Sequence, residues 1–255
     1  MKKISIITAT YNSANTIRDT LDCIARQDYG NIEHIIVDGK SKDNTLEIVA
    51  QYPHVAKVVS EKDKGIYDAM NKGIQLATGD IIGILNSDDI YINEQVLSKV
   101  AAAFQNGTDA CYADLQYVSG NDLNKVIRHW KAGHFNERSF LMGWMPPHPT
   151  FFVRREVYAK VGHFNLTLRS AADYELLLRI FVKNRFNIVY IPEVLVKMRA
   201  GGMSNASLKN RLRANNEDRM AWKINGLKPY FFTLYLKPLR KIIQFIQPKQ
   251  WLKLR

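Results

Sequence analysis

The chain has 255 residues, of which 46% are hydrophobic and 24% charged, so it can form one substantial globular domain and is neither collagen-like nor disordered. Cys23 and Cys111 are too few for a disulfide scaffold and lack the CxxC spacing of a cysteine zinc site. The formal net charge is +12, but residues 228–255 contain seven basic and no acidic residues. Residues 1–227 therefore carry a net charge of only +5, which argues against nucleic-acid binding by this main part of the chain.

Short apolar strands alternate with helices through the first third of the chain. The expected strands are 4–10, 33–37, 55–60 and 80–85, and the expected helices are 15–26, 41–51 and 66–77. This alternation with short connections predicts an α/β fold with an open, mainly parallel sheet and helices on both faces.

The second half is less regular. Helices are expected over 96–104, 155–161 and 173–183, and strands over 110–118, 126–130 and 150–153. No linker or repeat divides residues 1–226, so we expect one domain there. The apolar run that starts at Ile4 stops at Thr8, too early for a signal peptide, and no window is apolar enough to span a membrane, so a cytoplasmic location is expected.

Polar clusters follow three of the predicted strands, at residues 10–12, 38–41 and 86–89. Ligands of open parallel sheets bind beyond the carboxyl ends of the strands, so we expect a site where these clusters meet. The turn over 10–15 has no glycine, which excludes a dinucleotide-binding loop, a P-loop and a nucleotidyltransferase phosphate loop. Asp88 and Asp89 suit Mg²⁺ or Mn²⁺, although two such carboxylates can also stabilise the start of the next helix.

Several motifs occur in a fixed order. They read ISIITATYN, HIIVDGKSKDNT, EKDKGIYDAMNKGI and GDIIGILNSDDIY, followed by PPHPTFFVRREVYAKVGHFN and LRSAADYELLLRI. Over roughly residues 1–200 the chain resembles the family 2 glycosyltransferases of GT-A fold, and in particular the bacterial enzymes that build O-antigen, capsule or colanic-acid repeat units.

The resemblance implies a Mn²⁺- or Mg²⁺-dependent inverting enzyme. It would transfer a hexose, glucose or galactose, from a UDP-sugar to a saccharide on undecaprenyl diphosphate. Residues 1–92 would bind the nucleotide-sugar and residues 93–226 the acceptor. The donor-binding residues that it implies are Thr8, Thr10 and Tyr11 around the uracil, Asp38 on the uracil or ribose, Asp63 and Asp68 along the nucleotide, and Ser87 and Asp89 beside the metal ligand Asp88. Asp173 would be the catalytic base, or simply the N-cap of the helix that follows it.

Two positions depart from the family pattern. Asn86 stands where the first acid of DxDD is usual, so metal affinity would depend on the diphosphate of the donor. Met70 stands where many relatives carry arginine before Asn71, so Lys72 is a candidate for the diphosphate, although a solvated lysine on a helix is the alternative.

Two residues of the 143–149 loop are candidates for the acceptor side. His148, between two prolines, would contact the acceptor or the metal, or else be structural. Trp144 would form a platform for the acceptor sugar, or else be a buried loop tryptophan.

Residues 227–255 form a basic, aromatic tail. Pro229, Pro238 and Pro248 are expected to break it into short amphipathic helical segments rather than one long helix. We expect it to place the protein on the cytoplasmic face of the inner membrane. A helical hairpin packed on the body is the alternative. The alternative hypothesis for the whole chain is a non-catalytic membrane- or polyanion-binding protein. No nucleic-acid partner is expected, and association into a homo-oligomer is left open.

Overall fold

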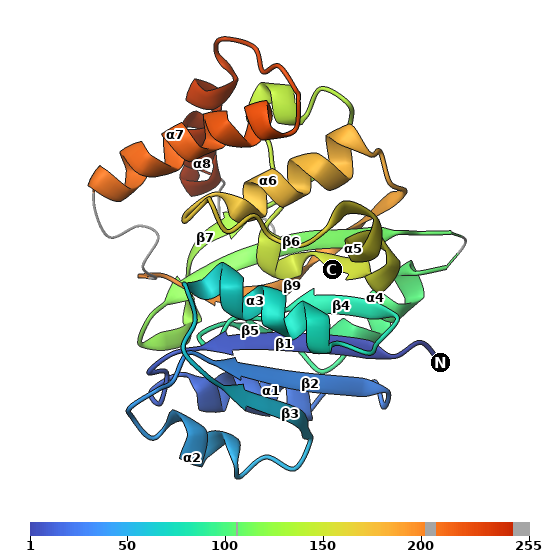
Figure 1. Ribbon diagram of the computed structural model, residues 1–255, viewed down its shortest axis with the longest axis vertical. Coiled ribbons are helices and arrows are strands. Elements are labelled where there is room, and N and C mark those ends of the chain that lie inside the picture. The colour runs from blue at the N-terminus through green and yellow to red at the C-terminus, as the bar shows by residue number, and fades with distance from the viewer. Residues whose placement is uncertain (106, 202–207, 247–255) are drawn as a thin grey trace.

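A computed structural model describes residues 1–105, 107–201 and 208–246. Its centre is a nine-stranded mixed sheet with the strand order β3-β2-β1-β4-β8-β6-β9-β5, and β7 pairs with β6 (Figure 1). The strands are β1 (Ile4–Thr10), β2 (Ile32–Asp38), β3 (Val55–Ser60), β4 (Ile81–Ile84), β5 (Ile90–Tyr91), β6 (Ala110–Ser119), β7 (Asp122–Trp130), β8 (Phe152–Arg154) and β9 (Ile188–Arg199). The first four are parallel to one another, which confirms the predicted α/β fold.

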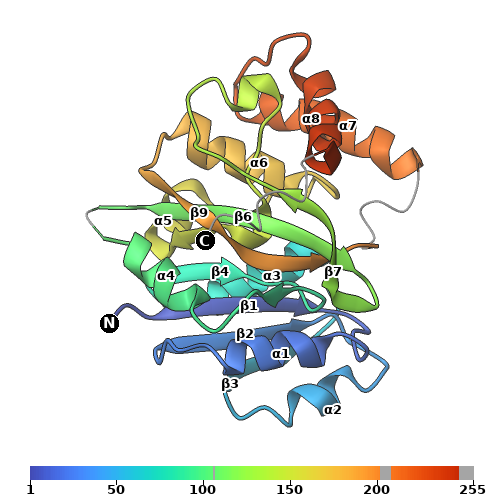
Figure 2. The same ribbon diagram turned by 180° about the vertical axis from the view of Figure 1, so that it is seen from behind.

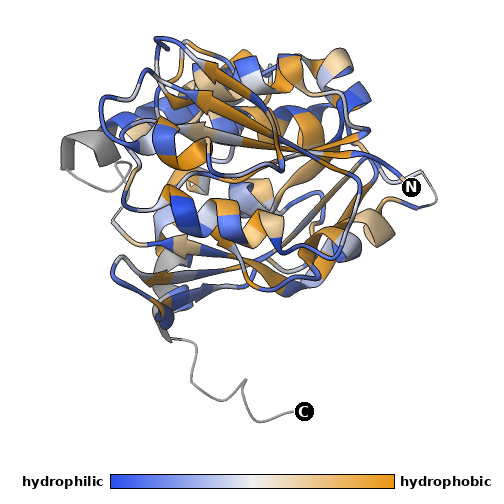
Figure 3. Ribbon diagram, turned by 90° about the horizontal axis from the view of Figure 1, so that it is seen from below, coloured by the Kyte–Doolittle hydropathy of each residue, from blue (hydrophilic) through white to orange (hydrophobic). Residues whose placement is uncertain are grey.

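Helices cover both faces of the sheet. They are α1 (Ile17–Ala25), α2 (Thr45–Val49), α3 (Ile66–Leu76), α4 (Val96–Ala103), α5 (Arg155–Val161), α6 (Ala172–Leu178), which a π-helical turn (Arg179–Lys183) extends, α7 (Leu208–Ile224) and α8 (Thr233–Ile246). Figure 2 shows α1 and α4 on the face opposite to α3. The strands are hydrophobic along much of their length, whereas the helices also carry hydrophilic stretches (Figure 3).

Successive side chains of β1 point to opposite faces of the sheet and pack into two separate hydrophobic cores. Ile4 and Ile6 pack with residues of α1 and α4, whereas Ile7 and Ala9 pack with residues of α3 and α6. A strand buried on both faces reads as a continuous apolar run, as the sequence of β1 does. Because β1, β2 and β4 are parallel neighbours, their carboxyl ends meet at one edge, where the polar clusters lie.

The sequence did not predict β9, which lies between β6 and β5. Its pairing with β6 runs from Ile191 opposite Ala113 directly to Val194 opposite Asp114, so Pro192 and Glu193 form a bulge without partners on β6. The bulge explains how proline, which cannot donate a ladder hydrogen bond, occurs within an internal strand.

The start of the tail is folded onto the body. Thr233 donates to the carbonyl of Leu141 at 2.6 Å, and Lys237 Nζ lies 2.7 and 2.8 Å from the two carboxylate oxygens of Asp218 on α7. The prediction that Pro238 breaks the chain is wrong, because Pro238 lies inside α8. The described part of the tail therefore matches the hairpin alternative, while Pro248 and the rest of 247–255 lie outside the described residues.

Candidate active site

The loops after β1 and β2 are held together by side chains. The amide of Asn12 donates to Ser41 Oγ at 2.8 Å, and the Asn12 side-chain oxygen accepts from the amide of Lys42 at 2.8 Å. Asn12 and Lys40 both have positive φ, +50° and +69°, a strained conformation that such cross-loop bonds maintain. Tyr11 emerges between these loops with 57% of its surface exposed, so its ring is available to a flat ligand.

The two threonines assigned to the uracil pocket differ in position. Thr8 is fully buried, and its hydroxyl pairs with His34 Nε2 at 3.0 Å, so its assignment as a pocket-lining residue is wrong for this geometry. Thr10 ends β1 at the edge of the site. Its hydroxyl is buried and has no hydrogen-bond partner among the described residues, as expected of a group that pairs with a ligand.

The Asp38 carboxylate holds the loop that follows β2. Its carboxylate accepts hydrogen bonds from the amides of Lys40 and Ser41 and from the hydroxyls of Ser41 and Ser60. A carboxylate offers about four acceptor positions, and Asp38 is fully buried. Three of these bonds go to Oδ2 and one to Oδ1, so Asp38 mainly holds its own loop and only Oδ1 keeps an acceptor position for uracil or ribose.

Asp63 and Asp68 support the start of α3. Asp63 accepts from the amide of Gly65 at 2.9 Å, and Asp68 accepts from the amide of Lys64 at 2.9 Å, so both carboxylates hold the turn that leads into the helix. Lys72 Nζ lies 2.8 Å from Glu61 and 3.7 Å from Asp68. Lys72 is therefore engaged in ion pairs on α3, and its assignment to the donor diphosphate is not supported by this geometry.

The NSDD segment brings several oxygens together at the end of β4. Ser87 bonds to Ser13 at 2.8 Å, which ties this segment to the β1 loop. Asp89 accepts from the Asn86 amide at 3.0 Å, yet its other carboxylate oxygen and the Asn86 side-chain oxygen are buried and find no partner in the part of the chain that the structure describes. Burial raises the pKa of Asp88, which Arg199 opposes, and burial together with the Asp88 charge raises the pKa of Asp89.

These groups fit a hard divalent cation. Carboxylate and amide oxygens are the ligands that Mg²⁺ and Mn²⁺ prefer, and a cation would relieve the cost of placing the buried Asp89 carboxylate beside the half-buried Asp88. Within the described residues no cluster of three or more histidine, cysteine, aspartate or glutamate side chains could hold a metal by itself. The ligand set contributed by this chain is therefore small, as Asn86 in place of an acid suggested.

Asp173 lies in the first turn of α6. The N-cap of α6 is Ala171, so the alternative reading of Asp173 as the N-cap is wrong. One carboxylate oxygen of Asp173 accepts from the hydroxyl of Tyr67 at 3.1 Å, and its other oxygen accepts no hydrogen bond from the described residues. Asp173 therefore has one oxygen held and one available.

Tyr117 of β6 links the two acidic groups. Burial raises the pKa of its hydroxyl, Arg128 lowers it, and the charges of Asp89 and Asp173 both raise it further. Both carboxylates therefore lie near this one hydroxyl, although they come from the ends of β4 and from α6. The predicted metal-binding segment and the predicted base therefore both act electrostatically on Tyr117.

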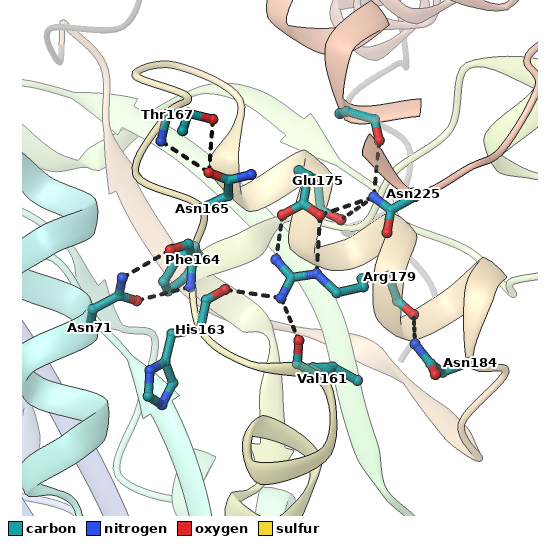
Figure 4. A network of polar contacts seen from close by, with 11 residues as sticks. Asn71, Val161, His163, Phe164, Asn165, Thr167, Glu175, Arg179, Asn184 and Asn225 are labelled. Carbon is teal, nitrogen blue, oxygen red and sulfur yellow. Dashed lines mark hydrogen bonds and ion pairs between the residues drawn. The ribbon is translucent and has the colours of Figure 1, made fainter. Parts of the chain in front are cut away.

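The loop before α6 is clamped from two sides (Figure 4). Asn71 of α3 donates to the carbonyl of Phe164 and accepts from its amide, both at 2.9 Å. Arg179 donates to the carbonyls of Val161 and His163 and pairs with the buried carboxylate of Glu175. These bonds fix the position of α6, and therefore of Asp173, relative to α3.

The two acceptor candidates have different environments. The His148 ring contacts Phe164 edge-on at 5.4 Å, and burial lowers its pKa while Asp173 acts in the opposite direction, so His148 is near the base. Trp144 is buried, and its indole N–H donates to the carbonyl of Ala132 at 2.7 Å. Trp144 belongs to an aromatic core with Phe140 and Phe181, so its assignment as a sugar platform is wrong.

Sequence reasoning missed three residues of this region. Tyr67 holds Asp173, Arg199 of β9 lies beside Asp88 and Asp89, and Glu217 of α7 accepts hydrogen bonds from three amides before α6. Of these three residues, only Tyr67 could have been found from the sequence. It precedes Asn71 by four residues within GIYDAMNKGI and so lies on the same face of the helix.

Two solved structures share the fold. TarS of S. aureus, residues 1–349 with UDP-GlcNAc, aligns with a TM-score of 0.68 and 20% identity over 88% of this chain and 65% of that one. The mannosyltransferase PcManGT from Pyrobaculum calidifontis, in complex with GDP-Man and Mn²⁺, aligns with a TM-score of 0.65 and 21% identity over 92% of this chain and 69% of that one. The chain therefore has the fold of these glycosyltransferases, as predicted.

Comparison of sequences gives the family. A PGL/p-HBAD biosynthesis glycosyltransferase of Mycobacterium tuberculosis is 33% identical over 208 residues, 79% of this chain and 78% of the relative. The Escherichia coli UDP-Glc:alpha-D-GlcNAc-diphosphoundecaprenol beta-1,3-glucosyltransferase WfgD is 28% identical over 122 residues, 47% of this chain and 48% of the relative. The profile of Glycosyl transferase family 2 matches residues 5–174. The chain belongs to this family and is a glycosyltransferase.

Proposed function

We propose that the protein is an inverting glycosyltransferase that moves a hexose, glucose or galactose, from a UDP-sugar to a saccharide carried on undecaprenyl diphosphate, in the synthesis of a surface polysaccharide such as O-antigen or capsule. The observation that carries the proposal is that two acidic groups each keep an unpaired carboxylate oxygen among the described residues: Asp89, beside Asp88 at the end of β4, and Asp173 at the start of α6. The activity named for WfgD supports the donor and the lipid-linked acceptor.

The donor lies along the carboxyl ends of β1 and β4. Its uracil packs against the exposed Tyr11 ring, and the unpaired hydroxyl of Thr10 donates to or accepts from the nucleotide. The loops around Asp38, Asp63 and Asp68 shape this site through backbone bonds rather than through free carboxylates.

Asp88, supported by Asp89, would hold Mn²⁺ or Mg²⁺ at the sugar diphosphate. When bound, the ion acts as a Lewis acid that stabilises the negative charge on the departing UDP. Arg199, whose guanidinium pairs with Asp19, favours the charged form of both carboxylates.

Asp173 acts as the general base. The acceptor hydroxyl oxygen attacks the anomeric carbon from the face opposite UDP, and the carbon–oxygen bond to the diphosphate breaks with its electron pair leaving on UDP. The hydroxyl proton passes to the Asp173 oxygen that accepts no other hydrogen bond. Attack on one face and departure from the other inverts the anomeric configuration.

The tail places the catalytic domain, residues 1–226, on the cytoplasmic face of the inner membrane. No helix within the described part of the chain is long and apolar enough to cross a bilayer. The exposed side of the α8 hairpin carries Phe231, 89% exposed, with Tyr235 at 57% and Leu239 at 52%, while Lys237 is neutralised by Asp218. An aromatic surface next to Lys228 and Arg240 suits the headgroup region of an anionic leaflet.

Calorimetry with UDP and Mn²⁺ tests the donor site. Wild type is expected to bind UDP more tightly with Mn²⁺ than without it, and Asp88→Ala to lose this gain, whereas Asp122→Ala at the exposed β6–β7 turn retains it. Asp173→Asn is expected to bind UDP normally and to lose at least about 100-fold in transfer from UDP-glucose or UDP-galactose. Vesicle binding without any binding of UDP would favour the non-catalytic rival.

Sedimentation with phosphatidylglycerol vesicles tests the membrane surface. The full-length Phe231→Ser/Leu239→Ser variant is expected to lose binding, and Val58→Ser, which removes a 48% exposed side chain from β3, is the matched control. Equal sedimentation of both variants and wild type would remove this part of the proposal.

A further inference from the structure

The partly buried hydroxyl of Tyr67 is the only described group that donates a hydrogen bond to the Asp173 carboxylate. The two residues lie 106 positions apart, one on α3 in the donor half and one on α6 in the acceptor half. The bond occupies one carboxylate oxygen of Asp173 and fixes the direction in which the other oxygen points.

The Tyr67 ring is itself held in place. It stacks on Phe164 with a centroid distance of 5.3 Å and an interplanar angle of 29°. Phe164 is locked by the two backbone bonds to Asn71, which lies one helical turn beyond Tyr67 on the same face of α3. Tyr67 therefore has little freedom to turn away from Asp173.

The hydroxyl stays protonated and so remains a donor to Asp173. Burial raises the pKa of Tyr67, and the neighbouring Asp173 raises it further, so the phenol stays protonated throughout the working range of the protein. A phenol that stays neutral does not compete with Asp173 for the proton of an acceptor.

We propose that Tyr67 is a positioning residue that orients the Asp173 carboxylate toward the acceptor hydroxyl. This inference rests on the proposed role of Asp173 as the base. Because α3 begins at the donor loops and carries both Tyr67 and Asn71, it sets the distance between the donor and the base. The tyrosine of GIYDAMNKGI, a motif of the donor half, would thereby help to position the base that deprotonates the acceptor.

The test uses full-length Tyr67→Phe, which keeps the ring stack and removes only the hydroxyl. We expect kcat for UDP-glucose or UDP-galactose, with a GlcNAc-diphosphoundecaprenol acceptor, to fall about 10- to 100-fold, the range given by one lost charge-assisted hydrogen bond. The donor KM, the affinity for UDP and the melting temperature are expected to change little. Tyr52→Phe is the matched control, because it removes a tyrosine hydroxyl bonded to Asp22 at 2.7 Å on α1.

Four outcomes test the inference and the proposed function separately. A kcat of Tyr67→Phe within twofold of wild type overturns the inference, and so does a loss of kcat matched by an equal loss in UDP affinity or by a large fall in melting temperature. Full activity of Asp173→Asn instead overturns the proposed function, because the base itself is then wrong. An inactive Asp173→Asn with a fully active Tyr67→Phe leaves the proposed function standing and removes only the role of Tyr67.

Discussion

Replacing Glu217 should loosen the start of α6, although Glu217 lies on α7 and beyond the family match. One of its carboxylate oxygens accepts from the amides of Arg169, Ser170 and Ala171 at 3.0, 2.6 and 3.1 Å. Ala171 is the N-cap of α6 and no side chain caps the helix from within. Glu217 therefore supplies the acceptor, and the negative charge, that a helix N-terminus lacks.

The magnitude follows from these three bonds. A hydrogen bond to a charged group contributes about 1.5–3 kcal/mol, but three donors share one oxygen, and water can reach Arg169 once the carboxylate is gone. We therefore expect Glu217→Ala to lower the free energy of unfolding by about 2–4 kcal/mol rather than by the full sum. For a chain of this size this loss corresponds to a fall of roughly 5–15 °C in melting temperature.

Two further variants separate charge from shape. Glu217→Gln keeps an acceptor oxygen without the charge and is expected to lose about half as much. Glu193→Ala breaks the ion pair of a half-exposed glutamate with Lys99 and is expected to cost under about 1 kcal/mol. Denaturant titration and calorimetry measure all three, with kcat as a second readout because Asp173 follows two residues after Ala171. The reasoning fails if Glu217→Ala is no less stable than Glu193→Ala.

Three other changes test the packing. Gly73→Ala would place a Cβ 2.3 Å from Ile7 Cγ2, so it should lower the free energy of unfolding by about 1–3 kcal/mol in thermal unfolding, although alanine favours helices. Gly30→Ala is the control and should be tolerated, because the added Cβ would meet only Met1, at 3.9 Å. Burial lowers the pKa of His34 to about 3, below its unfolded value, so stability should fall as the pH drops below about 6.5 by up to about 1.4 kcal/mol per unit; His34→Gln should flatten denaturation midpoints measured between pH 6.5 and 4.5. Lys237→Ala breaks the pair with Asp218 and the contact over the Tyr174 ring at 3.6 Å and should cost about 1–3 kcal/mol by denaturant titration, whereas exposed Lys228→Ala should cost under about 0.5.

The sequence predicts those parts of the fold that local pattern determines. The first four strands and α3 lie within one or two residues of their expected bounds, because buried parallel strands and an amphipathic helix leave distinct periodicities. The predicted helix over 41–51 shrinks to Thr45–Val49, since Asp43 bonds the amide and the hydroxyl of Thr45 within a turn before the helix. β9 was missed because a proline within a strand reads as a break unless the bulge opposite β6 is known.

In the candidate site, too, local pattern identifies some residues, while the role of others depends on contacts between distant parts of the sequence. The acids of NSDD and Asp173 were found from strand ends and motifs, but whether a carboxylate is free depends on partners distant in sequence. Asp38 is satisfied by Ser60, 22 residues away, and Trp144 by Ala132 across a loop. Among the described residues, the Asp173 carboxylate, in contrast, accepts a side-chain hydrogen bond from Tyr67 alone and keeps one oxygen available. Identical side chains in matching motifs thus acquire opposite roles, binding or structural, through long-range contacts that no local pattern encodes.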